Sequence, residues 1–234
     1  MMNDYSHYID YGTLFGYPNS RTGDLALQCL GYAKISYPEA VEPLAEFTRF
    51  VNGEKLDRLE EIYTRTFHIQ AICYLDLGYV IFGEDYKRGE FLVNMKREQM
   101  EAGNDCGDEL ADNLCNVLSL LPKIGDIDFR DELVAKMLVP SVKKMLSEFE
   151  TSRMAMKRQA LQKKHKALLQ EDEERMNIYQ YLLQGLLVIL ESDFKEALDS
   201  EPEFTPQPAF GAAFLSNCGT CAIPQPTKLQ NHGA

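Results

Sequence analysis

The sequence predicts an all-α protein, and three observations support this. Apolar residues recur at intervals of three and four along most of the chain, which is the spacing of one buried helix face. Period-two alternation is almost absent, and the one strand-like run, YVIF at residues 79–82, fits better inside an apolar helix. Glycine and proline separate the periodic segments, as they do at helix ends. We therefore expect one all-helical domain over residues 3–198, with a flexible tail over 199–234.

The first half of the domain shows four apolar helix faces in succession. The first contains Tyr5, Tyr8, Ile9, Gly12 and Phe15 and stops at the GYP of residues 16–18. The next three cover about residues 25–33, 44–51 and 56–66, and SYP at 36–38 and NG at 52–53 close the second and third. We therefore expect four helices before residue 68.

The second half predicts fewer but longer helices. We expect a helix over residues 86–102 that is closed at Gly103, and an amphipathic helix over 108–122 that ends at a proline. A long pattern runs from Asp126 to about Gln170, and a buried-looking helix covers about residues 172–192. The remaining segment, 199–234, is rich in proline, glycine and small residues, which is typical of a flexible tail.

Composition narrows the classes of function. A chain of 234 residues with 45% hydrophobic residues suits one sizeable core. Its formal net charge of -12 argues against binding nucleic acid or an anionic membrane surface, because both partners are negative. The N-terminus has no signal-peptide pattern, and the most apolar run, residues 178–190, is too short and polar to span a bilayer. We expect a cytoplasmic protein without membrane insertion.

The six cysteines do not suggest a disulfide framework in a chain of this length without a signal. Cys29, Cys73 and Cys115 sit among apolar residues and are expected in the core. Cys218 and Cys221 form a CxxC pair, which supplies two of the four ligands of a structural zinc site. A metal- or redox-linked protein using this pair, with Cys106 as a further ligand, therefore stays open as an alternative.

Motifs of catalysis are missing from the sequence. It contains no Walker loop, HExxH, GxSxG or dinucleotide-binding fingerprint. His68 and Cys73 are five residues apart, so on one helix they would point about 140° apart and would not meet. A basic stretch at residues 151–170 is interpreted as a solvated helix face rather than a nucleic-acid site. We expect no enzymatic activity.

Three segments resemble a known family in their order and spacing. They are LEEIYTRTF at residues 59–67, FGEDYKRGEFLVNMKREQMEAG at 82–103, and DELADNLCNVLSLL at 108–121. They are similar to the molybdoenzyme-specific chaperones, above all the nitrate reductase molybdenum cofactor assembly chaperones of the NarJ type within the TorD/DmsD superfamily. The family's LxxLYVxTFD, G(D/E)xxxRG and ELPD(H/Y)L motifs match at the following positions: Leu59, Ile62, Tyr63, Thr66 and Phe67; Gly83, Glu84, Arg88 and Gly89; Glu109, Leu110, Asp112 and Leu114.

The resemblance covers about residues 5–121 well and also includes LFGYP at residues 14–18. The chain departs from the family at Ala111, which replaces a proline, at His68, which replaces an aspartate, and at Asn113, which replaces a histidine or tyrosine. These differences bear on which enzyme is served. The tail with its CxxC has no counterpart in the resemblance.

The resemblance implies an all-helical, non-enzymatic chaperone. Such a protein binds the N-terminal peptide of an immature molybdoenzyme catalytic subunit until the molybdenum cofactor is inserted. It binds no cofactor permanently, because the cofactor is handled on the client; a homodimer is left open. We expect an apolar groove with acids at its rim: Tyr63 and Phe67 as the apolar side, and Arg88, Glu109 and Asp112 as charged contacts. The alternative for Tyr63 and Phe67 is an ordinary core position, and for the two acids a helix N-terminus; an acidic helical adaptor is a further alternative.

Overall fold

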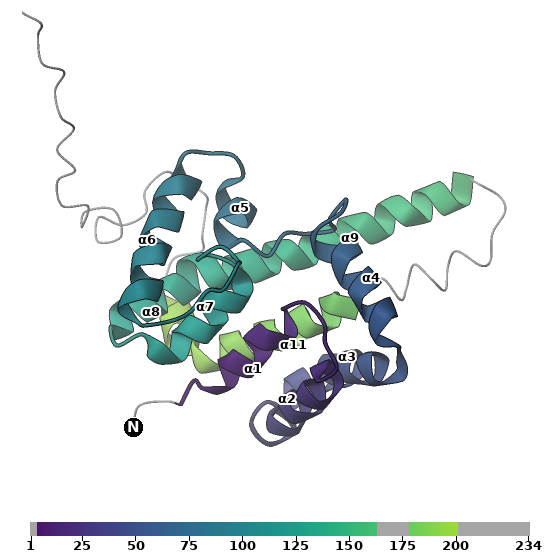
Figure 1. Cartoon of the computed structure of the whole chain (residues 1–234), viewed down its shortest axis with the longest axis horizontal. Coiled ribbons are helices and arrows are strands. Elements are labelled where there is room, and N and C mark those ends of the chain that lie inside the picture. The colour runs from purple at the N-terminus through teal and green to yellow at the C-terminus, as the bar shows by residue number, and fades with distance from the viewer. Residues whose placement is uncertain (1–3, 163–177, 201–234) are drawn as a thin grey trace, which may run out of the picture. The chain divides into compact units, whose positions relative to one another are not determined.

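The computed structural model describes residues 4–162 and 178–200, with side chains described for 4–151 and 178–200. All of them belong to the first of two units into which the chain divides, Met1–Phe204. The described residues form helices joined by loops, with no strand among them (Figure 1). The prediction of an all-α fold is thus confirmed. None of the described helices is long and apolar enough to cross a membrane.

The first four helices lie where the apolar faces predict them. They are α1 (His7–Leu14), α2 (Thr22–Ser36), α3 (Val41–Gly53) and α4 (Leu56–Phe67), with a short 3-10 turn, η1 (Pro38–Ala40), between α2 and α3. The turn begins at a proline, whose fixed φ suits a first helical position. The YVIF run also lies in a helix, α5 (Leu77–Phe82), and α6 (Lys87–Glu101) follows it. Gly103 has a φ of 59° just after α6, so the predicted stop is confirmed.

The predicted helix over residues 108–122 is wrong in its first half. The helix α7 covers only Leu114–Leu120, and η2 (Leu121–Lys123) ends it. The side chain of Asn113 caps α7 by accepting a hydrogen bond from Cys115 N at 3.1 Å. Asn116 Nδ2 donates to Leu110 O at 2.8 Å and to Cys106 O at 3.2 Å, which ties the preceding segment into a non-helical turn. These side-chain bonds compete with helical hydrogen bonds.

The long helical pattern from Asp126 is present with one interruption. Asp126 caps α8 (Ile127–Leu133) by accepting a hydrogen bond from Phe129 N at 3.1 Å. A π-helical turn, η3 (Val134–Leu138), separates α8 from α9 (Val139–Gln162). The predicted extension of this helix to Gln170 lies outside the described residues. After the gap come α11 (Ile178–Asp193) and α12 (Lys195–Ser200), so helix continues two residues into the segment expected as tail.

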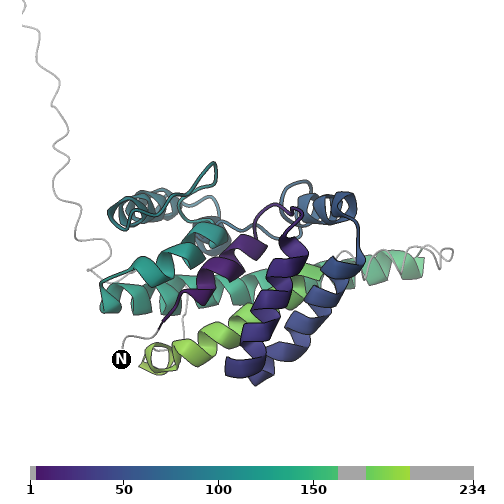
Figure 2. The ribbon, with the colours of Figure 1, turned by 60° about the horizontal axis from the view of Figure 1, so that its bottom comes forward.

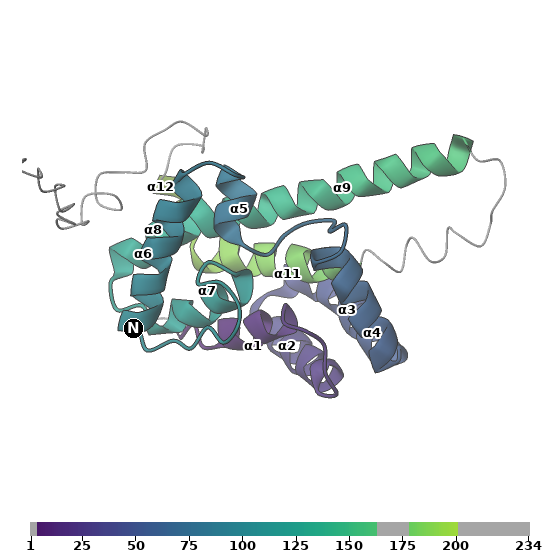
Figure 3. The same ribbon diagram turned by 45° about the horizontal axis from the view of Figure 1, so that its top comes forward.

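The core forms between helices that are distant in sequence. The helix α11 packs on α3 and α9, while α1 packs on α7 and α2 (Figures 2 and 3). At Gly185 of α11, a Cβ atom would lie 2.6 Å from the side chain of Leu44 of α3. Only glycine allows these two helices to lie so close together.

One polar cluster joins α1 and the residue after α2 to the end of α11. Asp193 at the end of α11 accepts hydrogen bonds from Tyr37 Oη at 2.6 Å and Tyr8 Oη at 3.0 Å. His7 Nε2 lies 3.1 Å from Asp193 Oδ2, within ion-pair distance but outside hydrogen-bond geometry. His7 and Tyr8 are buried. Asp193 therefore satisfies the hydroxyl groups of Tyr8 and Tyr37, while His7 lies beside the carboxylate without a hydrogen bond from its Nε2 atom.

Candidate functional site

Two of the three segments of the family resemblance, residues 82–103 and 108–121, come together with the start of α5 at one place. We call it the junction: residues 75–78, Arg88 and residues 109–114. Leu77 N donates to Asp112 O at 3.0 Å, and Leu114 N donates to Leu75 O at 2.9 Å. These bonds form an isolated antiparallel bridge between Asp76 and Asn113. The bridge brings the start of α5 against the turn before α7, although more than thirty residues separate the two in sequence.

Asp112 lies inside the junction, and its side chain has an exposed fraction of 0%. Its Oδ2 atom accepts a hydrogen bond from Gly78 N at 2.9 Å, in the first turn of α5. Burial raises the pKa of this carboxyl, the bond from Gly78 opposes the rise, and Asp76 adds to it. Oδ1 of Asp112 is buried and has no hydrogen-bond partner among the described residues.

This placement corrects the expectation for the acidic pair. Glu109 and Asp112 both lie outside α7, although the sequence predicts a helix over residues 108–122, because α7 begins only at Leu114. Glu109 is exposed and Asp112 is buried. Asp112 therefore stabilises the N-terminal end of α5. Because it is buried, only its solvent-exposed neighbours in the junction can contact a ligand.

The acids of the junction that reach solvent are Glu109, which is exposed, and Asp76, whose side chain is 23% exposed; we call this pair the acidic rim. Asn113 Nδ2 bridges them, donating to Asp76 Oδ1 at 3.2 Å and to Glu109 Oε2 at 3.5 Å. Arg88 Nη2 lies 3.8 Å from Asp76 Oδ2, and its guanidinium lies 5.0 Å from the ring centroid of Tyr79. Arg88 thus already has an acidic and an aromatic neighbour within the junction, and the rim presents the open carboxylate of Glu109.

An aromatic cluster adjoins the acidic rim. Tyr63 donates from its Oη to Phe15 O at 3.1 Å, and its ring lies 5.1 Å from that of Phe67 and 5.8 Å from that of Tyr179. Burial raises the pKa of Tyr63, and Cys115, Glu109 and Tyr17 act in the same direction, which places Glu109 within electrostatic reach. Both Tyr63 and Phe67 are only 4% exposed.

Tyr63 and Phe67 thus occupy core positions, the alternative expectation for them, because neither ring faces solvent. Tyr17 covers Tyr63 with its ring edge at a centroid distance of 5.4 Å and is itself 56% exposed. Ile69 and Tyr74, in the loop after α4, are 66% and 44% exposed. The exposed apolar side chains of this region are therefore Tyr17, which contacts the buried Tyr63, and Ile69 and Tyr74 in the loop before α5. The ring of Tyr74 lies 4.6 Å from that of Tyr79, the residue that Arg88 of the junction approaches.

His68 and Cys73 flank this loop without forming a catalytic pair. His68 is exposed at the C-terminal end of α4, where its ring lies 5.4 Å from that of Tyr63. Cys73 is 1% exposed, and burial raises the pKa of its thiol, which is the opposite of an activated nucleophile. Cys29 is also buried, as expected, and burial raises its pKa to about 12. Cys115 is only partly buried.

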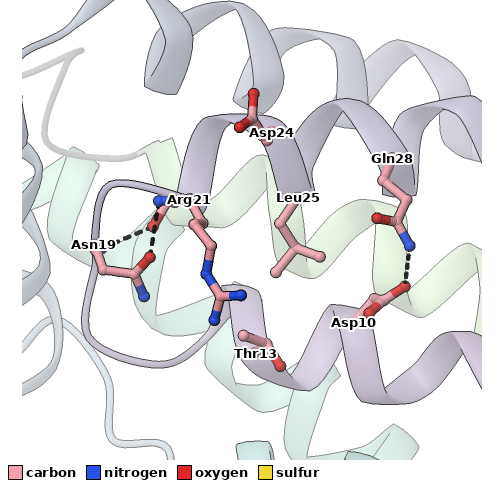
Figure 4. Close-up of a pocket in the computed structure, with 8 residues that line it drawn as sticks. Asp10, Thr13, Asn19, Arg21, Asp24, Leu25 and Gln28 are labelled. Carbon is pink, nitrogen blue, oxygen red and sulfur yellow. Dashed lines mark hydrogen bonds between the residues drawn. The ribbon is translucent and has the colours of Figure 1, made fainter.

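A separate polar pocket of about 350 Å³ lies between α1 and the start of α2 (Figure 4). Gln28 Nε2 donates to Asp10 Oδ2 at 2.8 Å across it, and Asn19 Oδ1 accepts from Arg21 N at 2.9 Å. Most of the charged and polar side chains that line it are exposed, and the acids and Arg21 give no single sign of charge. This arrangement favours no particular ligand.

The described residues contain no group of three or more His, Cys, Asp or Glu side chains that could bind a metal ion. Cys218 and Cys221, the weak metal candidates of the sequence, lie outside the described residues, as do the side chains of most of the basic stretch at 151–170. The metal-linked alternative therefore stays a prediction. Comparison of the sequence with family models and with curated proteins finds no match.

Sequence reasoning missed four residues of this surface, Tyr17, Ile69, Tyr74 and Asp76, and only Asp76 has a local signal. Asp76 precedes the apolar run LGYVIF, and an acid directly before a helical run is an N-cap signal that points to the start of α5. Tyr17 lies in the GYP stop of the first helix, where its type signals only a turn. Its place over Tyr63 depends on tertiary packing, and no local pattern indicates it.

Proposed function

We propose that this protein is a chaperone for a molybdoenzyme catalytic subunit of the nitrate reductase kind. It binds the N-terminal peptide of the immature subunit and keeps the subunit competent for insertion of the molybdenum cofactor, which is handled on the client. The proposal rests first on the sequence resemblance over residues 5–121. The observation that supports it is the junction, where two segments of the resemblance, residues 82–103 and 108–121, come together with residues 75–78 around Asp112.

The surface at the junction suits an amphipathic peptide with basic residues. The acidic rim of Asp76 and Glu109 offers carboxylates to Lys or Arg side chains, and Tyr17, Ile69 and Tyr74 offer exposed apolar area in the same region. Apolar contacts supply affinity in such recognition, and charge complementarity supplies orientation and association rate. A net charge of -12 favours a basic partner in the same way.

Co-purification from a native lysate tests the function, with the captured subunit identified by mass spectrometry. A molybdoenzyme catalytic subunit is the expected partner, and its N-terminal peptide then serves in calorimetry with the isolated protein. Recovery of no such subunit from cells that express one, together with no binding of the peptide, would contradict the proposal.

A pair of variants tests whether the acidic rim is the binding surface. The double change Asp76→Asn and Glu109→Gln should weaken peptide binding by about 1–3 kcal/mol and reduce its salt dependence. The matched control is Glu46→Gln with Glu191→Gln, two acids on α3 and α11 with side chains 43% and 42% exposed. Equal affinity in both double variants would show that the acidic rim is not the peptide-binding surface. The chaperone function would then still be tested by the co-purification experiment.

A further inference from the structure

Three large apolar side chains, Tyr86, Val93 and Met100, form a stripe along the outer face of α6, and Tyr86 is the residue directly before its first turn. They are 72%, 68% and 72% exposed. Their spacing is seven residues, so they follow one line along the helix for about 21 Å at 1.5 Å per residue. Figure 3 shows α6 beside α5 at one margin of the described helices.

The inner face of the same helix is already used by the core. Phe91, Met95 and Gln99 are 3%, 0% and 2% exposed and recur every four residues. At about 100° per residue, Val93 lies about 160° from the middle of this inner face. The stripe is therefore unrelated to the packing of α6 within the domain, and three exposed large apolar residues in line are typical of an interaction surface.

The charges beside the stripe indicate which partner fits. Glu90 and Arg97 lie on the same flank of the stripe, one on each side of Val93 along the helix axis. Arg97 also lies 3.0 Å from Glu98 and 4.0 Å from Glu101 in the same helix, and these solvent-accessible pairs are weak enough for a partner's carboxylate to replace them. A two-fold axis through Val93 that reverses the helix direction places Glu90 of one copy beside Arg97 of the other, twice. The same axis places Tyr86 opposite Met100. The surface is thus complementary to itself in the antiparallel arrangement, as a two-fold interface requires.

We propose that α6 is the interface of a homodimer, in which two copies of this chain pack their stripes of Tyr86, Val93 and Met100 in antiparallel orientation. The interface is distinct from the junction, and the proposal stands whether or not the protein serves a molybdoenzyme. One exposed helix from each copy makes a small interface, so the dimer is expected to dissociate on dilution.

Analytical ultracentrifugation of the full chain over a range of concentrations tests the proposal. The native protein should show a reversible monomer–dimer equilibrium, and Val93→Glu should weaken dimerisation by about a hundredfold because it places two charges at the centre of the interface. The matched control is Ile35→Glu on α2, a change of the same chemistry at a residue that is 84% exposed, and it should leave the equilibrium unchanged.

Charge reversal tests the antiparallel arrangement itself. Glu90→Arg and Arg97→Glu should each weaken dimerisation by about tenfold, because each homodimer then contains two like-charged pairs. An equimolar mixture of the two variants should associate at least as well as the native protein, since both cross-pairs are again opposite in sign. A native protein that stays monomeric up to its solubility limit overturns the proposal. A dimer that is insensitive to Val93→Glu does so as well.

Discussion

The backbone N–H of Gly78 donates to Oδ2 of Asp112 at 2.9 Å, and this bond connects two segments that are 34 residues apart in sequence. Gly78 lies in the first turn of α5, where backbone N–H groups lack partners within the helix. Asp112 supplies that partner from a turn that precedes α7. The buried acid thus fixes the geometry on which the exposed residues of the junction depend.

Replacing Asp112 should affect folding rather than ligand contact. Asp112→Ala removes the acceptor of Gly78 N and should lower the free energy of unfolding by about 1–3 kcal/mol. Asp112→Asn keeps an acceptor and should cost less at neutral pH. Chemical denaturation of the three proteins measures both effects, and equal stability of the alanine variant and the native protein would contradict the role assigned to this bond.

The raised pKa of Asp112 makes the stability of the fold depend on pH in a definite direction. The folded protein binds the proton of the Asp112 carboxyl more tightly than the unfolded chain does. Stability therefore falls as the pH rises from 3.8, the ordinary pKa of an aspartate, through the raised pKa of the folded state. Asp112→Asn, which cannot ionise, should therefore gain stability relative to the native protein over this rise in pH. Denaturation midpoints at a series of pH values check the trend; a constant difference between the two proteins would count against it.

Gly78 should tolerate no side chain. A Cβ atom there would lie 2.7 Å from Asp112 Oδ2 and 3.0 Å from Phe91 Cδ1. Gly78→Ala should therefore destabilise the fold by about 1–3 kcal/mol through overpacking. Gly89→Ala in α6 is the matched control, because a Cβ atom there meets nothing within 4 Å. The Gly89→Ala change should raise stability by about 0.5–1 kcal/mol. Thermal melting of both variants distinguishes the steric effect at Gly78 from the general effect of replacing a helical glycine with alanine.

Asp193 should give the protein part of its resistance to acid. Burial alone would raise its pKa, but the contacts with His7, Tyr37 and Tyr8 outweigh burial and keep the pKa below 3.8. The folded state thus holds this proton less tightly, so its stabilisation is present above about pH 4 and is lost as pH falls further. Asp193→Asn should lower stability at pH 7 by about 1–3 kcal/mol and should flatten the loss at low pH.

The measurement for Asp193 is the free energy of unfolding from pH 2 to 7, taken with urea at each pH. Glu196→Gln on α12 is the control, because this carboxylate is exposed. The substitution should change neither the stability at pH 7 nor the loss of stability at low pH. If the Asp193→Asn variant loses as much stability at low pH as the native protein does, other carboxylates are responsible for that loss.

Tyr17 should contribute to peptide binding without being needed for folding. It is 56% exposed while the tyrosine beneath it is buried, so Tyr17→Ala removes apolar area that a ligand can reach. We expect peptide affinity to fall by about 1–2 kcal/mol and thermal stability to change little. Fluorescence anisotropy with the client's N-terminal peptide measures the first effect, and Tyr86→Ala on α6 controls for loss of an exposed tyrosine. Equal losses in both variants would argue against a site at Tyr17.

The sequence by itself determined which segments are helical, because apolar periodicity and the stops at residues 16–18, 52–53 and Gly103 are local signals. It failed over residues 108–113, where the side chains of Asn113 and Asn116 form hydrogen bonds that favour a turn over a helix. Only the tertiary structure placed Asp112 inside and Glu109 outside. Whether a carboxylate faces water depends on what packs over it, and for Asp112 that is α5, a segment thirty residues earlier in the chain.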